Sequence, residues 1–306
     1  MAGNRGMLIN GTIFIVLCII WGSSFILIKE GISNLSPYQV ATIRILSAGL
    51  VLLPVAIRQW KNVPRNKLGY VFLSGLLGSF FPAYLFCIAE MKIDSSLAGF
   101  LNSLTPIFTI FTGLLFFGQV FQTHKLVGVF IAMGGMLVLL FAKGSISVQY
   151  LSYASFALVA TVLYGLNINL VGRHLKETSS LAVVAVSFAL LLIPCLIILW
   201  ISGYFSLPLG QKSMLISSGA SALLGIMGTA VATILFYIMI KRAGGLFASM
   251  VTYGIPFIAL SWGLLAGETI NSWQVVGLVI ILMGVYVTTR WNKEVRGRKY
   301  EVRKSK

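Results

Sequence analysis

The segment Gly75–Leu115, GLLGSFFPAYLFCIAEMKIDSSLAGFLNSLTPIFTIFTGLL, recurs in diverged form 150 positions later. There, Gly225–Leu265 has the sequence GIMGTAVATILFYIMIKRAGGLFASMVTYGIPFIALSWGLL, with ten identities in 41 ungapped positions. Half of the ten identical residues are glycine, alanine or proline, which fix close backbone approach and kinks. Shared hydrophobicity alone would not align them, so the chain is a tandem duplication.

The composition is that of a membrane protein. Of the 306 residues, 58% are hydrophobic and only 10% are charged, and the mean hydropathy is +0.95. A soluble domain is about a quarter charged. The apolar runs are about 18–25 residues long, which is enough for a helix to cross the hydrocarbon core. They are continuous rather than alternating, which favours helices over the strands of a barrel.

Ten spans are expected, five in each copy of the duplication. The first repeat covers 8–142, the second covers 150–291, and a basic tail follows at 292–306. Because five is odd, the second repeat must cross the membrane in the opposite sense to the first. Inverted repeats are typical of secondary transporters, whose site lies near the midplane between the repeats. The expected spans are 8–28, 38–57, 67–88, 95–117, 124–142, 150–171, 180–201, 214–239, 245–266 and 273–291.

Positive charges predict the orientation. With a cytoplasmic N-terminus, eighteen Lys and Arg fall on the inner side and four on the outer side, so both termini are expected in the cytoplasm. The net charge is +16, and eight of the 23 basic residues lie at or after Arg290. A basic tail after a membrane span is expected to bind anionic lipid headgroups rather than nucleic acid.

The sequence shows no motif for ATP hydrolysis, metal binding or acid–base catalysis. No P-loop motif is present. His124 and His174 fall in expected connections, and Cys18, Cys87 and Cys195 lie inside apolar runs, which favours quiet buried thiols. No paired carboxylates lie in the middle of a span. We therefore expect no enzyme activity, no cofactor and no metal.

Two prolines near the middle of spans predict matched kinks. Pro106 and Pro256 each free the carbonyl group four residues earlier, on Asn102 and Thr252. Loosened backbone is tolerated in a membrane where it faces protein or a water-filled cavity. The kinks are therefore either cavity-lining or hinges made for packing. The cavity interpretation makes candidate solute contacts of Asn102, Ser103, Thr252 and Tyr253.

Polar residues at helical spacing extend this candidate site. Span 4 carries Asn102, Thr105, Thr109 and Thr112 on one face, and span 8 carries Thr229, Thr233 and Tyr237. Threonine hydroxyls also bond back to their own helix, so each stripe is equally consistent with packing. Deep aromatic and amide residues complete the predicted lining. The further candidates are Tyr84, Tyr164, Asn167 and Thr233.

Arg44 is the one basic residue well inside a span. An intramembrane charge is costly and is a functional candidate by default. Arg44 could hold a substrate carboxylate, but the commoner role is to snorkel outward or to pair with an acid on the outer side. Glu90 and Glu268 belong to that acidic group and are the candidates for ion coupling. The Gly-x-x-Gly pairs and the glycines of spans 5 and 10 predict close helix packing.

At this point the chain resembles EamA-type permeases of the drug/metabolite transporter superfamily. The resemblance rests on Trp21-Gly22-Ser23-Ser24-Phe25, on Arg44, on Pro106 and on Pro256…Gly267-Glu268…Gln274…Gly277…Gly284, and it covers about 10–290 in two copies. It implies a ten-helix inverted repeat around a central cavity, and often export of amino acids, related metabolites or amphipathic drugs. The first half departs from the pattern, because Gly118-Gln119 stands where the family often has Gly-Glu.

The sequence therefore predicts an all-α polytopic secondary transporter, and the resemblance implies that it lies in a bacterial inner membrane. It would export a small organic solute by alternating access around a cavity between the repeats. A passive pore or a lipid scramblase of the same architecture is the alternative. Substrate, direction, coupling ion and oligomeric state stay open at this stage.

Overall fold

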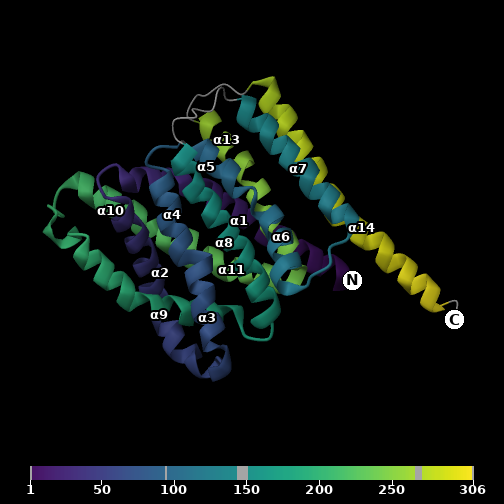
Figure 1. The fold of residues 1–306 in the computed structure, drawn as a ribbon, viewed down its shortest axis with the longest axis horizontal. Coiled ribbons are helices and arrows are strands. Elements are labelled where there is room, and N and C mark those ends of the chain that lie inside the picture. Colours follow the sequence, from purple (N-terminus) through teal and green to yellow (C-terminus); the bar gives the residue numbers. More distant parts are fainter. Residues whose placement is uncertain (1, 94, 143–150, 266–270, 305–306) are drawn as a thin grey trace.

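The computed structural model describes residues 2–93, 95–142, 151–265 and 271–304, and its regular secondary structure there is helical (Figure 1). Two helices are continued by π-helical segments, η3 (Leu76–Phe80) and η6 (Leu224–Val231). The α-helices are α1 (Ala2–Ile32), α2 (Pro37–Gln59), α3 (Leu68–Gly75), α4 (Phe81–Ala89), α5 (Ser95–Asn102), α6 (Thr105–Phe117), α7 (Thr123–Ala142), α8 (Leu151–His174), α9 (Ser180–Ile201), α10 (Lys212–Leu223), α11 (Ala232–Ala243), α12 (Gly245–Ser249), α13 (Ile255–Leu265) and α14 (Ser272–Lys304).

The ten expected spans correspond to ten apolar helical stretches of the described chain. Eight are long and apolar enough to cross a membrane, and two shorter apolar stretches lie in α7 and α14. The third span of each repeat consists of two α-helices joined by a π-helical segment, α3–η3–α4 and α10–η6–α11. The predicted class, an all-helical membrane protein of two inverted five-helix repeats, is confirmed.

Local sequence signals explain where individual helices begin and end. Ser36 caps α2 by accepting a hydrogen bond from the backbone of Gln39, whose side chain accepts one from the Ser36 backbone in return. Gly118 ends α6 in the left-handed conformation, with φ 59°. At the other end of the chain, α14 continues without a break from the expected last span through the tail as far as Lys304.

The helix contacts follow a two-fold pattern between the repeats. The second spans, α2 and α9, pack together, and so do the fifth spans, α7 and α14. The first span of each repeat packs against the third and fourth spans of the other. Thus α1 contacts α10, α11 and α13, while α8 contacts α4, α5 and α6. The interior of the protein is therefore built by both repeats together.

Glycines allow α7 and α14 to approach closely, and Figure 1 shows the two helices side by side. A Cβ atom on Gly135 would lie 2.7 Å from the carbonyl oxygen of Gly277, and one on Gly284 would lie 2.5 Å from the carbonyl oxygen of Gly128. These four are among the glycines of spans 5 and 10 that the sequence predicts to serve packing, whereas a Cβ atom on Gly134 in span 5 meets nothing within 4 Å. Small residues of this kind let backbones meet inside a membrane.

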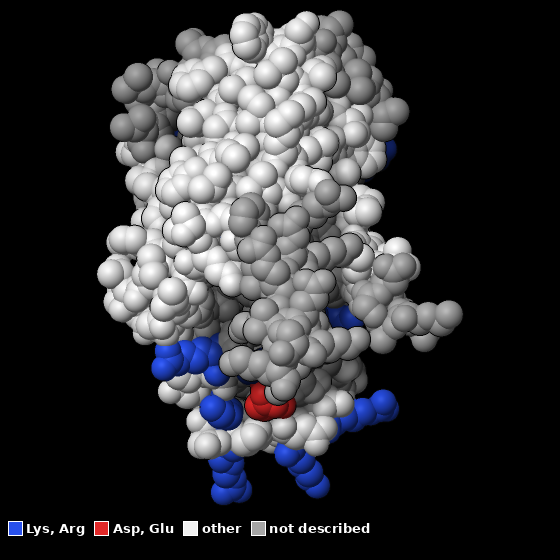
Figure 2. All heavy atoms as spheres, turned by 90° about the vertical axis from the view of Figure 1, so that its right-hand side faces the viewer, with Lys and Arg blue, Asp and Glu red and all other residues white. Residues whose placement is uncertain are grey.

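Charged side chains are unevenly distributed on the face of the molecule that Figure 2 draws. Figure 2 shows Lys and Arg side chains gathered at the lower end of the face that it draws, below a largely uncharged surface. Helices α2 and α3 are joined by a basic connection containing Lys61, Arg65 and Lys67. This separation is typical of membrane proteins, in which an apolar middle lies in lipid and basic residues lie beyond it.

Candidate functional site

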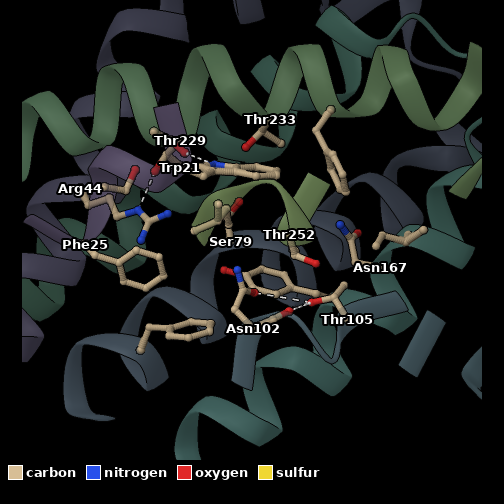
Figure 3. Close-up of a pocket in the computed structure, with 18 of the residues that line it drawn as sticks. Trp21, Phe25, Arg44, Ser79, Asn102, Thr105, Asn167, Thr229, Thr233 and Thr252 are labelled. Atoms are coloured by element: carbon tan, nitrogen blue, oxygen red, sulfur yellow. Dashed lines mark hydrogen bonds between the residues drawn. The ribbon is translucent and has the colours of Figure 1, made fainter. Parts of the chain in front are cut away.

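A cavity lies between the two repeats, where their first, third and fourth spans meet (Figure 3). It holds about 830 Å³ of empty space, part of it open to solvent. Its walls combine aromatic and aliphatic side chains with hydroxyl and amide groups. This is the composition of a site for a small organic molecule with both apolar and polar parts.

Most of the lining consists of residues from equivalent positions of the two repeats. In the third and fourth spans the two members of a pair are 150 positions apart. In the first spans they are 143 positions apart, which is also the separation between Ser36 and Ser179 at the starts of α2 and α9. The lining pairs are Gly78 with Gly228, Ser79 with Thr229, Phe86 with Phe236, Asn102 with Thr252, Thr105 with Ile255, Trp21 with Tyr164, Ser24 with Asn167 and Phe25 with Ile168.

Irregular helix geometry lies at the cavity in both repeats. The π-helical segments η3 and η6 contain the lining pair Gly78 and Gly228. In the fourth spans, the α-helix stops at Asn102 before α6, and a 3₁₀ segment, Met250–Tyr253, precedes α13. Interruptions of this kind are frequent at functional sites, and in a membrane protein they are tolerated where they line a cavity.

The predicted proline kinks are positions where a new helix starts. Pro106 lies in the first turn of α6, so its missing N–H leaves no helical hydrogen bond unmade. The carbonyl oxygen of Asn102 accepts a hydrogen bond of 2.6 Å from Thr105 Oγ1. Pro256 likewise follows Ile255, the first residue of α13. The backbone at Asn102 and Thr252 therefore turns at the cavity wall.

One intramembrane cation lies on the cavity wall. Arg44 of α2 contributes to the lining, and its Nε donates a hydrogen bond of 2.6 Å to Thr229 Oγ1 (Figure 3). Thr229 in turn donates to the carbonyl oxygen of Leu224, five residues earlier, within η6. The π-helical segment thereby places the hydroxyl group that orients the guanidinium.

A buried polar pair closes another part of the cavity. Asn167 Nδ2 donates to the Tyr237 hydroxyl oxygen over 3.0 Å, joining α8 to α11. Gly78 faces this pair, and a Cβ atom there would overlap Asn167 and come within 3.0 Å of the Tyr237 oxygen. Glycine is therefore required at position 78 to bring η3 against the pair.

Five of the eight predicted solute contacts line the cavity, and three do not. The lining contacts are Asn102, Tyr164, Asn167, Thr233 and Thr252. Tyr84 hydrogen bonds to Thr42 Oγ1 over 2.7 Å, Ser103 donates back to the carbonyl oxygen of Phe100, and Tyr253 donates to the carbonyl oxygen of Val129. Tyr84 and Tyr253 thus bond to neighbouring helices and Ser103 bonds back within its own span, and none of the three lines the cavity, so the candidate site excludes them.

The polar stripes have different roles. All three residues of the span 8 stripe line the cavity, whereas in span 4 only Asn102 and Thr105 do so. Thr109 and Thr112 face α8, where Asn169 donates 2.8 Å to the Thr109 carbonyl oxygen and 2.9 Å to Thr112 Oγ1. The second half of that stripe is therefore packing between α6 and α8, held by an asparagine that the sequence analysis did not single out.

Glu90 directly follows the span that ends at Ala89, and its side chain is fully buried. Ser95 Oγ donates to one carboxyl oxygen over 3.4 Å, while the other oxygen has no hydrogen-bond partner within the described chain. Burial raises the pKa of Glu90 to about 8, against the lowering effects of Lys29, Ser95 and Arg44. Burial therefore favours the uncharged form of the Glu90 carboxyl group. Glu268 lies outside the described residues.

Sequence reasoning missed much of the apolar wall. Phe25, Phe86, Phe236 and Ile28 form part of that wall, and the polar Ser79 beside them was missed as well. Their types carry no signal in a chain rich in phenylalanine. The duplication could have found some of them, because Ser79 and Phe86 align with Thr229 and Phe236 in the second copy.

Relatives with curated names align over almost the whole chain. A "Probable amino-acid metabolite efflux pump" of Escherichia coli strain K12 is 26% identical, covering 94% of this chain and 98% of its own. Its counterpart in Salmonella typhimurium is 27% identical, with coverages of 91% and 94%. The "Uncharacterized inner membrane transporter YedA" of Escherichia coli strain K12 is 26% identical, with coverages of 91% and 90%.

A comparison with solved structures and a family model agree with the similarity to these transporters. A crystal structure of another protein has a TM-score of 0.69 with this chain, covering 95% of this chain and 99% of its own at 16% identity, which shows the fold alone. The model of the EamA-like transporter family matches twice, at residues 9–141 and 151–290, one match for each repeat. The protein is therefore a multi-pass membrane transporter rather than an enzyme. The chain belongs to the EamA-like transporter family of the drug/metabolite transporter superfamily.

Proposed function

We propose that this protein is a secondary transporter that exports amino acids or related small organic metabolites by alternating access. The observation that carries the proposal is the paired lining of the cavity. Equivalent residues of two inverted repeats surround one central space, so the repeats can exchange conformations and open the same site to either side. A single site with alternate exits is the basis of carrier transport.

The size and chemistry of the cavity support the solute class. Amphipathic walls of aromatic rings, hydroxyl groups and amides suit a small molecule with an apolar body and a polar head. Relatives covering nearly the whole chain are named as probable amino-acid metabolite efflux pumps, which supports both the solute class and the outward direction.

The location and orientation belong to the same proposal. The excess of basic residues in the connections assigned to one side supports a bacterial inner-membrane protein with both termini in the cytoplasm. The basic stretch after Arg290 would then lie beside anionic headgroups of the inner leaflet. A relative named as an inner membrane transporter supports this location.

Counterflow into proteoliposomes tests the proposal. Vesicles containing the purified protein are loaded with one unlabelled amino acid from a panel, and entry of a labelled trace of the same compound is followed. A carrier gives saturable entry with a transient overshoot above equilibrium. Linear entry without an overshoot for every compound would overturn the proposal in favour of a passive pore, and transbilayer movement of labelled phospholipid would favour a scramblase.

A matched variant separates cavity transport from leak. Gly78→Leu would fill the space beside Asn167 and Tyr237, whereas Gly219→Leu, where a Cβ meets nothing within 4 Å, adds the same bulk elsewhere. We expect the first variant to lose counterflow and the second to keep it.

A further inference from the structure

Arg44 is the only charged residue among the described residues that line the cavity. The other lining residues are hydroxyl and amide side chains, glycines, aromatic rings and isoleucines. A cation held in an apolar membrane protein is costly unless it has a partner or a function. Arg44 makes no ion pair within the described chain, and its one side-chain hydrogen bond there is to the neutral Thr229.

The position of Arg44 depends on a close contact between α2 and η6. A Cβ atom on Gly225 would overlap the carbonyl oxygen of Arg44 and the hydroxyl of Ser47, so glycine is needed for α2 to lie this near. Thr229, four residues further along η6, then accepts the bond from Arg44 Nε. The contact at Gly225 thus fixes the backbone of Arg44, and the hydrogen bond to Thr229 fixes the Nε edge of its guanidinium.

The remaining edge of the guanidinium is available to a ligand. Nη1 and Nη2 make no hydrogen bond within the described chain, and the group lies on the cavity wall beside Phe25 (Figure 3). A fixed guanidinium presents two parallel N–H groups, and this fork matches the two oxygens of a carboxylate.

Within the described part of the chain, Arg44 forms no ion pair with an acidic side chain. Burial raises the pKa of Glu90 above its ordinary value and so favours its uncharged form, although the nearby charges of Lys29 and Arg44 lower that pKa. The second repeat has no matching cation, because the residue 143 positions after Arg44 is Ser187, whose hydroxyl donates to the carbonyl oxygen of Val184. Arg44 is therefore a single positive charge on one side of a cavity whose lining otherwise consists mostly of matched residues from the two repeats.

We propose that Arg44 binds the carboxylate group of the transported solute, whose apolar body lies against the phenylalanines of the cavity. Phe25, Phe86 and Phe236 supply that apolar wall. The inference rests on the proposed function, since it takes the cavity to be the solute site. It narrows the solute class to amphipathic carboxylates, with or without an amino group.

Binding to the purified wild-type protein tests this without requiring transport. The probes are pairs with one apolar body, each a carboxylic acid and its carboxamide, in a series from acetate to large aliphatic and aromatic acids, with and without an α-amino group. Stabilisation against thermal unfolding in detergent micelles gives an apparent affinity for each. We expect at least one acid to bind at least about tenfold more tightly than its carboxamide. Equal binding within every pair, or no binding by any acid, would overturn the proposal.

Variants on α2 then assign the effect to Arg44. Arg44→Gln should abolish the preference for the acid, and Arg44→Lys should keep part of it because a charge remains without the fork. Arg58→Gln removes the same charge from an exposed position of the same helix and should leave the preference unchanged. A preference that survives in a folded Arg44→Gln protein would contradict the assignment.

The two proposals can fail separately. One possible result is counterflow of a solute that lacks a carboxylate, such as an amine or an alcohol, without competition from any acid. That result would support the carrier function and overturn the carboxylate site at Arg44. The opposite result is acid-selective binding that depends on Arg44, together with non-saturable flux. That result would support the carboxylate site and overturn the carrier function.

Discussion

Replacing Gly135 with alanine tests the packing of the two repeats at their fifth spans. The new Cβ atom would lie 2.7 Å from the carbonyl oxygen of Gly277 and 2.7 Å from the backbone nitrogen of Ile281. Ordinary contact begins at 3.4 Å, so α7 and α14 must separate by about 0.7 Å, because backbone atoms cannot rotate away as a side chain does. Overpacking of this kind costs about 1–3 kcal/mol.

Gly134 provides the matched control on the same helix. A Cβ atom there meets nothing within 4 Å, so Gly134→Ala gains the helix preference of alanine without a clash. Both variants gain that preference, and the difference between them isolates the contact with α14. The free energy of unfolding, measured by titrating detergent-solubilised protein with a denaturing detergent, should be about 1–3 kcal/mol lower for Gly135→Ala than for Gly134→Ala. Equal stability of the two variants would refute the contact.

Three further predictions concern single side chains. Asn169→Ala removes hydrogen bonds that join α8 to α6 and should lower the free energy of unfolding by about 1–3 kcal/mol in the same titration; an unchanged value would contradict it. Trp21→Phe keeps an aromatic ring but loses the 2.9 Å bond from Nε1 to the Gly228 carbonyl oxygen, and should cost about 0.5–1.5 kcal/mol. A variant as stable as wild type would show that this bond contributes nothing. Because the pKa of Glu90 in the folded protein lies above its ordinary 4.5, its stabilising contribution is complete below about pH 4.5 and is lost as the pH rises through about 8. Wild-type stability should therefore fall over that window relative to Glu90→Gln, by at most about 1.4 kcal/mol per pH unit, and parallel curves would refute this.

The membrane spans could be predicted from sequence because length and apolarity alone decide whether a segment crosses a bilayer. The expected span 180–201 coincides with α9, and the expected span 38–57 falls inside α2. The duplication supplied the inverted repeat and the matched breaks at Pro106 and Pro256. Continuous apolar runs indicate the spans, and glycine and proline mark the breaks because their effects on the backbone are local.

The orientations of side chains within the site were harder to predict from the sequence. Tyr253 was expected at the cavity because it follows the freed carbonyl of Thr252, but a short 3₁₀ segment turns it toward α7, where it bonds to Val129. The π-helical segments shift the rotation of every residue after them, and no residue type signals them. The orientation of Arg44 depends on such a segment, since Thr229 lies within η6.

Reactivity of cysteines at two repeat-related positions tests the central claim most directly. Asn102→Cys and Thr252→Cys are each made in a chain whose native cysteines are replaced, and an impermeant thiol reagent is applied to intact cells or to inverted vesicles. The account predicts that both positions react from both sides of the membrane and that a bound solute slows both reactions. Reaction from one side only, or from neither, would contradict a cavity that opens alternately through the two repeats.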